Sequence, residues 1–276
     1  MPFEIARLPA SFHLRGPALF ISDLHLSPAL PRTVAAFDAL LQGPAQAAGE
    51  LFILGDFFEY WVGDDMLDTD PDDPASFGAF ARDIAARLAA LGEAGLPIYI
   101  MPGNRDFLLG QRFARCARAT LLHDPCVVER FGQRIVLTHG DMLCRDDLAY
   151  MRYRRVVRSP RLQRLFLALP LRFRMAIAER LRARSAGAQQ RKIYDDVDHA
   201  AARELFSCAD ARTLIHGHTH RPACHEDLDS QGQPTHRWVL TDWECDHGRP
   251  RAGYLQWDAD GLRAVPYSAP LEPAAH

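Results

Sequence analysis

The chain of 276 residues is long enough to bury a large core, as one domain or two. Hydrophobic residues make up 48% and charged residues 24%, as in ordinary soluble globular proteins, and the net charge of −3 argues against general attraction to nucleic acid. No secretory signal is evident at the start, no apolar run reaches the ~20 residues that span a bilayer, and the six cysteines form no Cys-x-x-Cys pair. We therefore expect a cytoplasmic protein with reduced thiols and no thiolate metal site.

The first half of the chain alternates between short apolar runs and segments of helical periodicity. The helical segments are residues 31–48 and 75–94. The expected strands are residues 18–22, 51–54, 97–101 and 135–138. This alternation predicts helices packed around a parallel or mixed sheet. An acidic, proline-containing stretch at residues 64–74 is expected to be a surface loop.

From residue 146 to residue 201 the pattern becomes wholly helical. Ser159 is a good N-cap before Pro160, and Pro170 ends that helix. We interpret these residues as a helical hairpin inserted into the core, after which strands are expected at 237–241 and 253–257. The expected division is a core of 14–145 and 202–267, an inserted lid of 146–201 and a tail of 268–276.

Metal-binding side chains stand at or just after the ends of the expected strands. Asp23 and His25, two apart on an extended segment, point the same way, and Gly55 lets the chain turn to expose Asp56. Because sites in open α/β sheets form at the carboxyl ends of strands, these side chains are expected to converge. The predicted metal ligands are Asp23, His25, Asp56, Asn104, His139, His218 and His220. The neighbouring His216 is expected to pack behind them.

The donor set indicates the chemistry. Oxygen and nitrogen donors without thiolate suit Mn²⁺, Fe or Zn better than Ca²⁺, and a carboxylate such as Asp56 can bridge two cations. Two cations about 3.5–4 Å apart polarise a phosphoryl group and lower the pKa of a bridging water, so hydrolysis needs no protein nucleophile. The sequence therefore predicts a two-metal phosphoesterase.

The spacing of these motifs resembles the calcineurin-like metallophosphoesterases. That resemblance implies a two-sheet sandwich flanked by helices (αββα), here with a helical lid insertion. It implies that one ion is held by Asp23, His25, Asp56 and His220. It implies that the other is held by Asp56, Asn104, His139 and His218.

Longer stretches resemble one branch of that superfamily, the bacterial UDP-2,3-diacylglucosamine diphosphatases of lipid A biosynthesis. They are residues 22–26 (SDLHL), 53–65 (ILGDFFEYWVGDD), 103–110 (GNRDFLLG), 139–144 (HGDMLC), 165–170 (LFLALP) and 215–222 (IHGHTHRP). The resemblance implies two Mn²⁺ ions and hydrolysis of that lipid-linked nucleotide sugar to UMP and 2,3-diacylglucosamine 1-phosphate. It implies catalytic roles for Asp56, Asn104, Arg105 and His139. It implies substrate contacts from Asn104, Arg105, Asp147, Ser185, Gln189, Lys192 and His218.

Arg105 bears on the leaving group. Related phosphoesterases commonly carry histidine at this position, where it can protonate an alkoxide. An arginine cannot donate a proton at neutral pH, but it can neutralise developing phosphoryl charge. A phosphate leaving from a diphosphate needs no such acid, so Arg105 favours diphosphate cleavage. The alternative is that Arg105 only binds substrate charge.

The insertion is strongly basic between residues 151 and 192, where Glu179 is the only acid. Such a run can be a solvated helix face, a surface attracted to anionic lipid or a cover over a lipid substrate. Interleaved aromatic residues for nucleic-acid stacking are absent, so no nucleic-acid partner is expected. We expect a peripheral protein at the cytoplasmic face of the inner membrane, with no obligate protein partner.

Two other functions compete. One is a phosphodiesterase or nucleotide pyrophosphatase with a soluble substrate. The other is a non-catalytic phosphoesterase scaffold, but such a scaffold is expected to have lost ligands, and none is missing here.

Overall fold

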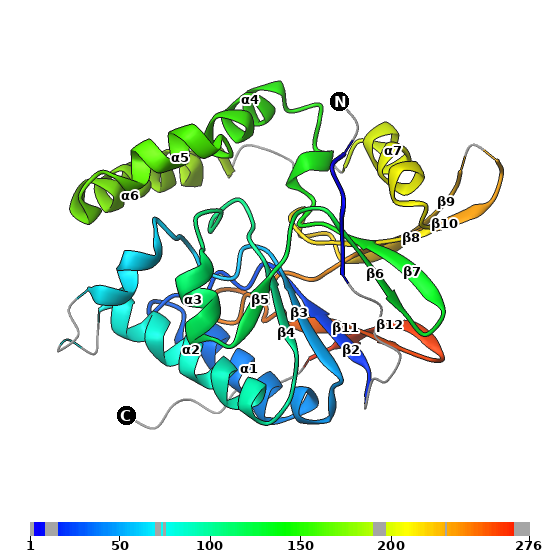
Figure 1. Cartoon of the computed structure of the whole chain (residues 1–276), viewed down its shortest axis with the longest axis horizontal. Helices are drawn as coiled ribbons and strands as arrows, with labels where there is room; N and C mark the ends of the chain where they lie inside the picture. The colour runs from blue at the N-terminus through cyan, green and yellow to red at the C-terminus, as the bar shows by residue number, and fades with distance from the viewer. Residues whose placement is uncertain are drawn as a thin grey trace.

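The computed structural model describes residues 3–8, 16–69, 73, 76–189, 197–229 and 231–267, with backbone alone for 182–189. Two six-stranded mixed sheets lie face to face (Figure 1). The first has the order β12-β11-β2-β3-β4-β5 and the second β1-β6-β7-β8-β10-β9. The strands of the first sheet are β2 Ala18–Ile21, β3 Glu50–Leu54, β4 Ile98–Met101, β5 Ala119–Leu121, β11 Gly253–Asp258 and β12 Gly261–Pro266. Those of the second are β1 Ala6–Arg7, β6 Cys126–Arg130, β7 Gln133–Leu137, β8 Thr213–His216, β9 Ala223–Leu228 and β10 Pro234–Val239.

The functional half of each sheet is parallel. Strands β2, β3, β4 and β5 pair in parallel in the first sheet, as do β7 with β8 and β8 with β10 in the second. All residues of β2 and β3 are buried, which agrees with their apolar sequences, from which only Glu50 of β3 departs. The predicted strands are confirmed to within a few residues. Parallel pairing brings the carboxyl ends of several strands to one edge, where the candidate ligands follow.

Helices cover the outer face of each sheet. Helices α1 (Pro31–Gln42), α2 (Phe77–Glu93) and α3 (Gln111–Cys116) lie on the first sheet, and α7 (His199–Ala209) lies on the second (Figure 1). Proline begins α1, and the Ser76 hydroxyl caps α2 by accepting a hydrogen bond from the Ala79 amide. A short 3₁₀ helix, η1 (Pro44–Ala47), completes the first predicted helical segment.

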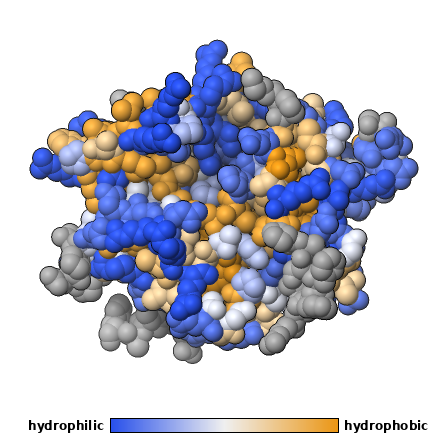
Figure 2. Space-filling view, in the orientation of Figure 1, coloured by the Kyte–Doolittle hydropathy of each residue, from blue (hydrophilic) through white to orange (hydrophobic). Residues whose placement is uncertain are grey.

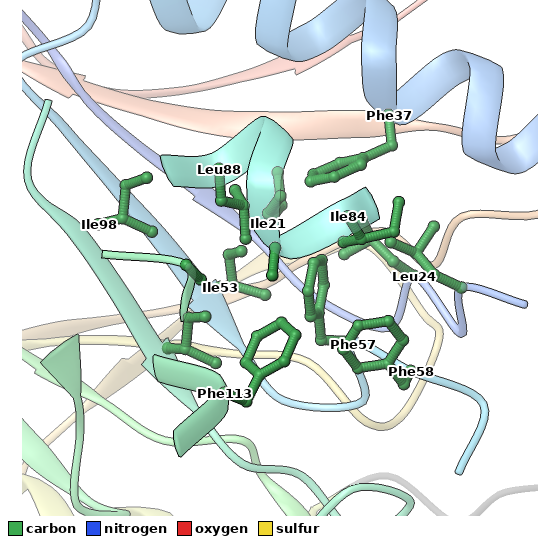
Figure 3. Close-up of a cluster of buried hydrophobic side chains, with 14 of the residues drawn as sticks. Ile21, Leu24, Phe37, Ile53, Phe57, Phe58, Ile84, Leu88, Ile98 and Phe113 are labelled. Carbon is green, nitrogen blue, oxygen red and sulfur yellow. The ribbon is translucent and has the colours of Figure 1, made fainter. Parts of the chain in front are cut away.

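Three buried clusters follow this layering. The largest lies between the first sheet and its helices, and Figure 3 shows Ile21 and Ile53 of the strands facing Phe57, Phe113 and Ile84. A second cluster fills the space between the two sheets, and a third lies under α7. The arrangement is helix, sheet, sheet, helix, so the predicted sandwich is confirmed.

The insertion forms an elongated helical layer along one edge of the sandwich (Figure 1). Its helices are α4 (Leu148–Val157), α5 (Pro160–Leu167) and α6 (Leu171–Gln189), with η3 (Asp141–Leu143) before them. Pro170 separates α5 from α6, as predicted, but the described part contains three helices where a hairpin was expected. We call α4, α5 and α6 the lid. No helix in the described ranges is both long enough and apolar enough to cross a bilayer.

The acidic stretch at residues 64–74 differs from the expectation. Residues Asp64–Asp68 form a 3₁₀ helix, η2, in which Met66 and Leu67 are buried. The Asp64 carboxylate accepts hydrogen bonds from the amides of Gly110 and Arg112, both at 2.8 Å. The acidic side chain is therefore structural, and this part of the stretch belongs to the core. The predicted tail, 268–276, lies outside the described residues.

Candidate active site

The seven predicted ligands follow five strands drawn from both sheets and meet at one edge. Asp23 and His25 follow β2, Asp56 follows β3, and Asn104 follows β4. His139 follows β7, and His218 and His220 follow β8. The parallel neighbours within each sheet therefore bring together side chains as far apart in sequence as residues 23 and 220.

The first group consists of Asp23, His25 and His220, whose donor atoms lie within 4.8 Å of one another. The Nε2 atom of His220 is 3.5 Å from Oδ1 of Asp23. The Nε2 atom of His25 is 3.9 Å from Oδ2 of Asp56. Two imidazoles and two carboxylates thus face a common point, which is suitable geometry for a borderline divalent cation.

The second group is built around His139, which is fully buried. Its Nδ1 lies 3.0 Å from the Leu54 carbonyl, and its Nε2 faces Asn104 Oδ1 at 2.9 Å and Asp56 Oδ1 at 3.7 Å. The His218 ring lies beside that of His139, with centroids 5.1 Å apart. Asp56 therefore stands between the two groups with one carboxylate oxygen toward each.

The carboxylates at this edge hold positive charge on His139 but not on His218. Burial lowers the pKa of His139, but the carboxylates of Asp56 and Asp23 outweigh burial and raise it to about 9. Burial and the neighbouring His139 lower the pKa of His218 to about 4. Burial raises the pKa of Asp23, but His220 and the other imidazoles outweigh it and lower that pKa. Buried carboxylates that stabilise a proton on a neighbouring imidazole would also stabilise a metal cation that replaces that proton.

The loops that carry these residues are sharply bent. Asp23, His25, Asp56, His218 and His220 all have positive φ, between 49° and 68°. Non-glycine residues rarely adopt this left-handed region, and such residues gather at functional sites. The sequence predicted that Asp23 and His25 point the same way because they lie two apart on an extended segment. The backbone is not extended there, so this reason was wrong. The two side chains meet because both backbones turn.

Glycines let these loops approach one another. A Cβ atom on Gly103 would lie 2.3 Å from Oδ1 of Asp56, and one on Gly217 would lie 2.2 Å from Oδ2 of Asp23. Real Cβ atoms do not come this close to other atoms, so packing requires glycine at both positions. The amide of His218 also donates to Oδ2 of Asp23 at 2.9 Å, which fixes the last loop to the first.

Comparison with known proteins places this geometry in context. Residues 16–222 match the model of the calcineurin-like phosphoesterases. The chain is 46% identical over 273 residues to a protein of Ralstonia nicotianae named UDP-2,3-diacylglucosamine hydrolase, covering 95% of this chain and 97% of that protein. Proteins of the same name from Aromatoleum aromaticum and Pseudomonas aeruginosa are 47% and 44% identical, covering 88% and 90% of this chain and 94% and 98% of theirs.

The chain belongs to the calcineurin-like phosphoesterase family. Members of this family depend on metal, and two overlapping groups of donors fit such a centre: Asp23 with His25 and His220, and Asp23 with Asp56 and His139. The expected fold is therefore confirmed by the family model and by the two sheets. The ligand roles of the individual residues stay predictions.

Three carboxylates support this phosphoesterase site and had no role assigned from sequence. Asp106 is buried and accepts from the amides of Gly103 at 2.7 Å and Phe57 at 2.8 Å, which joins two ligand loops. Glu59 lies 3.4 Å from Nδ1 of His25 and 3.5 Å from Arg105. Glu59 and Asp106 stood inside the motifs. Asp242 lies 3.6 Å from Nδ1 of His220. The one sequence signal for it was its position just after an expected strand.

The predicted substrate-binding residues are only partly described. The Arg105 amide donates to Asp56 Oδ1 at 2.8 Å, which fixes its backbone beside the site. The Asp147 carboxylate caps α4 by accepting from the Tyr150 amide at 3.0 Å. The side chains of Ser185 and Gln189, and all of Lys192, lie outside the described residues. His216 is buried, with Nδ1 2.8 Å from the Gly217 carbonyl, so its predicted packing position is confirmed.

Helix α4 attaches the lid directly to the ligand loops. The Tyr150 hydroxyl and the Arg154 guanidinium both donate to Oδ2 of the buried Asp141, at 2.7 and 2.8 Å. The Arg158 guanidinium donates to the Gly103 carbonyl at 2.9 Å. These arginines belong to the basic run, but they are partly buried and bind groups of the core.

Proposed function

We propose that the chain hydrolyses the diphosphate bond of UDP-2,3-diacylglucosamine to UMP and 2,3-diacylglucosamine 1-phosphate. The proposal is carried by a phosphoesterase centre that lies under an apolar, arginine-rich lid. Relatives that cover nearly the whole chain bear the name of a hydrolase for that substrate. A lipid-linked nucleotide sugar has the charged diphosphate and the apolar chains that this combination suits.

The ligand assignment follows the two groups at the strand ends. One cation would be held by Asp23, His25, Asp56 and His220, and the other by Asp56, Asn104, His139 and His218. Two divalent cations there would polarise the phosphoryl oxygens and make water nucleophilic at neutral pH. The oxygen and nitrogen donors are consistent with Mn²⁺. Metal analysis of the purified protein tests its identity and the count of two.

The substrate contacts are assigned by the same proposal. Arg105 would neutralise charge on the transferred phosphoryl group, because its guanidinium stays protonated at neutral pH. Asn104 and His218 would contact both metal and substrate. Asp147, at the start of the lid, would bind the sugar phosphate together with Ser185, Gln189 and Lys192.

The lid would hold the acyl chains. We propose residues 146–201 as an insertion, of which α4, α5 and α6 form the lid, on a core of 14–145 and 202–267. Its exposed large apolar side chains are Leu148, Tyr153, Val156, Leu162, Leu165, Leu167, Leu169, Phe173, Ile177 and Leu181. In the described part of the chain, only Phe131 and Leu228 are comparably exposed elsewhere. Figure 2 shows apolar surface gathered over α5 and α6 between patches of polar surface.

Acyl chains are therefore expected to contribute strongly to substrate selection. We expect kcat/KM for UDP-2,3-diacylglucosamine to exceed that for UDP-N-acetylglucosamine by about 100-fold or more. Each buried methylene contributes about 0.8 kcal/mol, so burial of about four methylenes is sufficient for such a ratio. Parallel assays of UMP release measure it. Equal efficiency on the two substrates would favour a nucleotide pyrophosphatase with a soluble substrate.

The lid also suits peripheral attachment to the cytoplasmic face of the inner membrane, which we propose as the location of the enzyme. Exposed arginines stand beside the apolar side chains, among them Arg161 and Arg164 of α5. Each basic residue near an anionic membrane contributes about 1 kcal/mol, and salt screens this attraction.

Replacing Arg161 and Arg164 with alanine is expected to weaken binding to phosphatidylglycerol vesicles by about 30-fold, because ~2 kcal/mol of attraction is lost. Vesicle co-sedimentation at low salt measures the change. The matched control removes Arg203 of α7 and Arg249, both exposed and outside the lid. If the control double variant lost as much affinity, the membrane surface would not be the lid.

A further inference from the structure

One arginine of the lid is buried although its neighbours are not. Among residues 148–181, all of them described, Arg174 is the only buried residue, and just 2% of it is exposed. Burying a guanidinium costs several kcal/mol unless its donors are satisfied, and an apolar side chain could pack there without that cost. The position of Arg174 therefore requires an explanation beyond apolar packing.

The guanidinium of Arg174 joins α6 to the loop that follows Trp61. Its Nη1 atom donates to the Val62 carbonyl and, at 3.0 Å, to Oδ1 of Asp65. Its Nη2 atom donates to Oδ2 of Asp65, so the ion pair is bidentate. Its Nε atom donates to the Leu169 carbonyl at 2.9 Å, which ties the end of α5 to the same point. A planar fork of this kind fixes orientation as well as distance.

The loop that receives Arg174 is shaped for it. Gly63 has a φ of 138°, which side-chain-bearing residues rarely adopt. A Cβ atom there would lie 2.4 Å from Nη1 of Arg174 and 2.8 Å from Cδ2 of Leu167. The glycine thus leaves the space that the lid arginine and a lid leucine occupy.

This loop is also joined to the proposed catalytic machinery. The Trp61 amide donates to the Arg105 carbonyl at 3.2 Å, and the Trp61 indole donates to Asp64 at 3.0 Å. The opposite end of the lid is attached through Arg154 and Arg158 of α4. The lid is therefore attached through α4 and through the start of α6, and α5, with its exposed apolar residues, lies between these attachments in the chain.

We propose that Arg174 is a positioning residue that holds the α6 end of the lid at a fixed place over the site, so that the lid receives the acyl-bearing half of the substrate in register with the metal centre. This inference rests on the proposed function for the identity of the substrate. The attachment of the lid itself does not depend on that identity, and the two parts have separate readouts.

The test compares Arg174→Met with Arg180→Met, which replaces an exposed arginine six residues further along α6. Each variant loses one basic residue and one tryptic site from the same helix. We expect Arg174→Met to raise KM for UDP-2,3-diacylglucosamine by about 10-fold, because the lid loses its charge-assisted hydrogen bonds to Asp65. Hydrolysis of bis(4-nitrophenyl) phosphate should change by less than about 2-fold. Native-state trypsin cleavage within the lid should become about 10-fold faster.

Asp65→Asn supplies a second route to the same contact, because Asp65 is partly exposed and its replacement leaves no buried charge on the loop side. Its effects should match those of Arg174→Met in direction, and the double variant should be no worse than the more affected single variant. Arg174→Lys, which cannot form the bidentate fork, should restore only part of the KM.

Three results would overturn the proposal. Trypsin cleavage of the Arg174→Met lid at the rate of Arg180→Met would mean that Arg174 does not hold the lid. Equal losses on the acylated and the small substrate would mean that its role is general stability. Unchanged KM for the acylated substrate would mean that lid position does not matter. Failure of the proposed function would show separately, as a wild-type enzyme without preference for the acylated substrate.

Discussion

Asp56→Asn is expected to lower kcat by about 10³-fold or more without lowering stability. Asp56 places one carboxylate oxygen near His25 and the other near His139, and it is 2% exposed. Loss of the charge shared by both proposed metal groups removes about 4 kcal/mol or more of transition-state stabilisation. An asparagine oxygen can still accept the hydrogen bond from the Arg105 amide, so the loop should keep its conformation.

Turnover of the acylated substrate, metal content per chain and thermal midpoint should be measured on the same preparation. We expect fewer than one ion per chain in the variant, against two in the wild type. Asp83→Asn is the control. The Asp83 carboxylate is exposed and pairs with Arg87 of the same helix, and Arg87 also pairs with α1. Wild-type turnover by Asp56→Asn would refute the two-metal assignment.

Arg130→Met is expected to lower the free energy of unfolding by about 3–5 kcal/mol, because it leaves the Glu50 carboxylate buried without its charged partner. Arg130 of β6 and Glu50 of β3 are 2% and 1% exposed. Two hydrogen bonds join them, at 2.9 Å from Nε and 2.8 Å from Nη2. The pair is a buried polar contact between the two facing sheets.

Urea denaturation of the single variants Arg130→Met and Glu50→Leu, and of the double variant that combines them, measures the contribution of the pair to the free energy of unfolding. A buried ion pair replaced on both sides by apolar residues is often neutral or stabilising. We therefore expect the double variant to recover most of the stability that either single variant loses. Additive losses would show that the charges do not interact energetically across the sheets.

The sequence predicted the parts of the fold whose signal is local. Strands β2 and β3 are buried along their whole length, so their apolar runs were legible without a partner. The convergence of the candidate ligands was predictable for a related reason: each follows a strand, and parallel pairing brings strand ends together. Pro170 marked the boundary between α5 and α6 because proline cannot continue a helix.

Other features depend on contacts that no local pattern contains. Strand β9 is mostly exposed and lacks an apolar run, so its pairing with β10 had no hydrophobic signal. Asp64 looked like a loop residue, but amides 46 and 48 residues further along the chain satisfy its carboxylate. Arg174 was indistinguishable from its basic neighbours because its binding partners lie in a loop more than a hundred residues earlier. Charge alone gives no sign of which arginine of a helix is buried.

The positive φ angles of Asp23, His25, Asp56, His218 and His220 have a consequence for laboratory evolution. An L-residue with a side chain costs roughly 1–2 kcal/mol in this region, and glycine avoids most of that cost. Screening this enzyme for heat resistance, with no demand for turnover, should therefore enrich glycine at the three histidines, whereas Asp23 and Asp56 accept backbone hydrogen bonds that glycine would lose. Variants selected in this way should gain thermal stability and lose hydrolysis, because each substitution removes a proposed metal ligand.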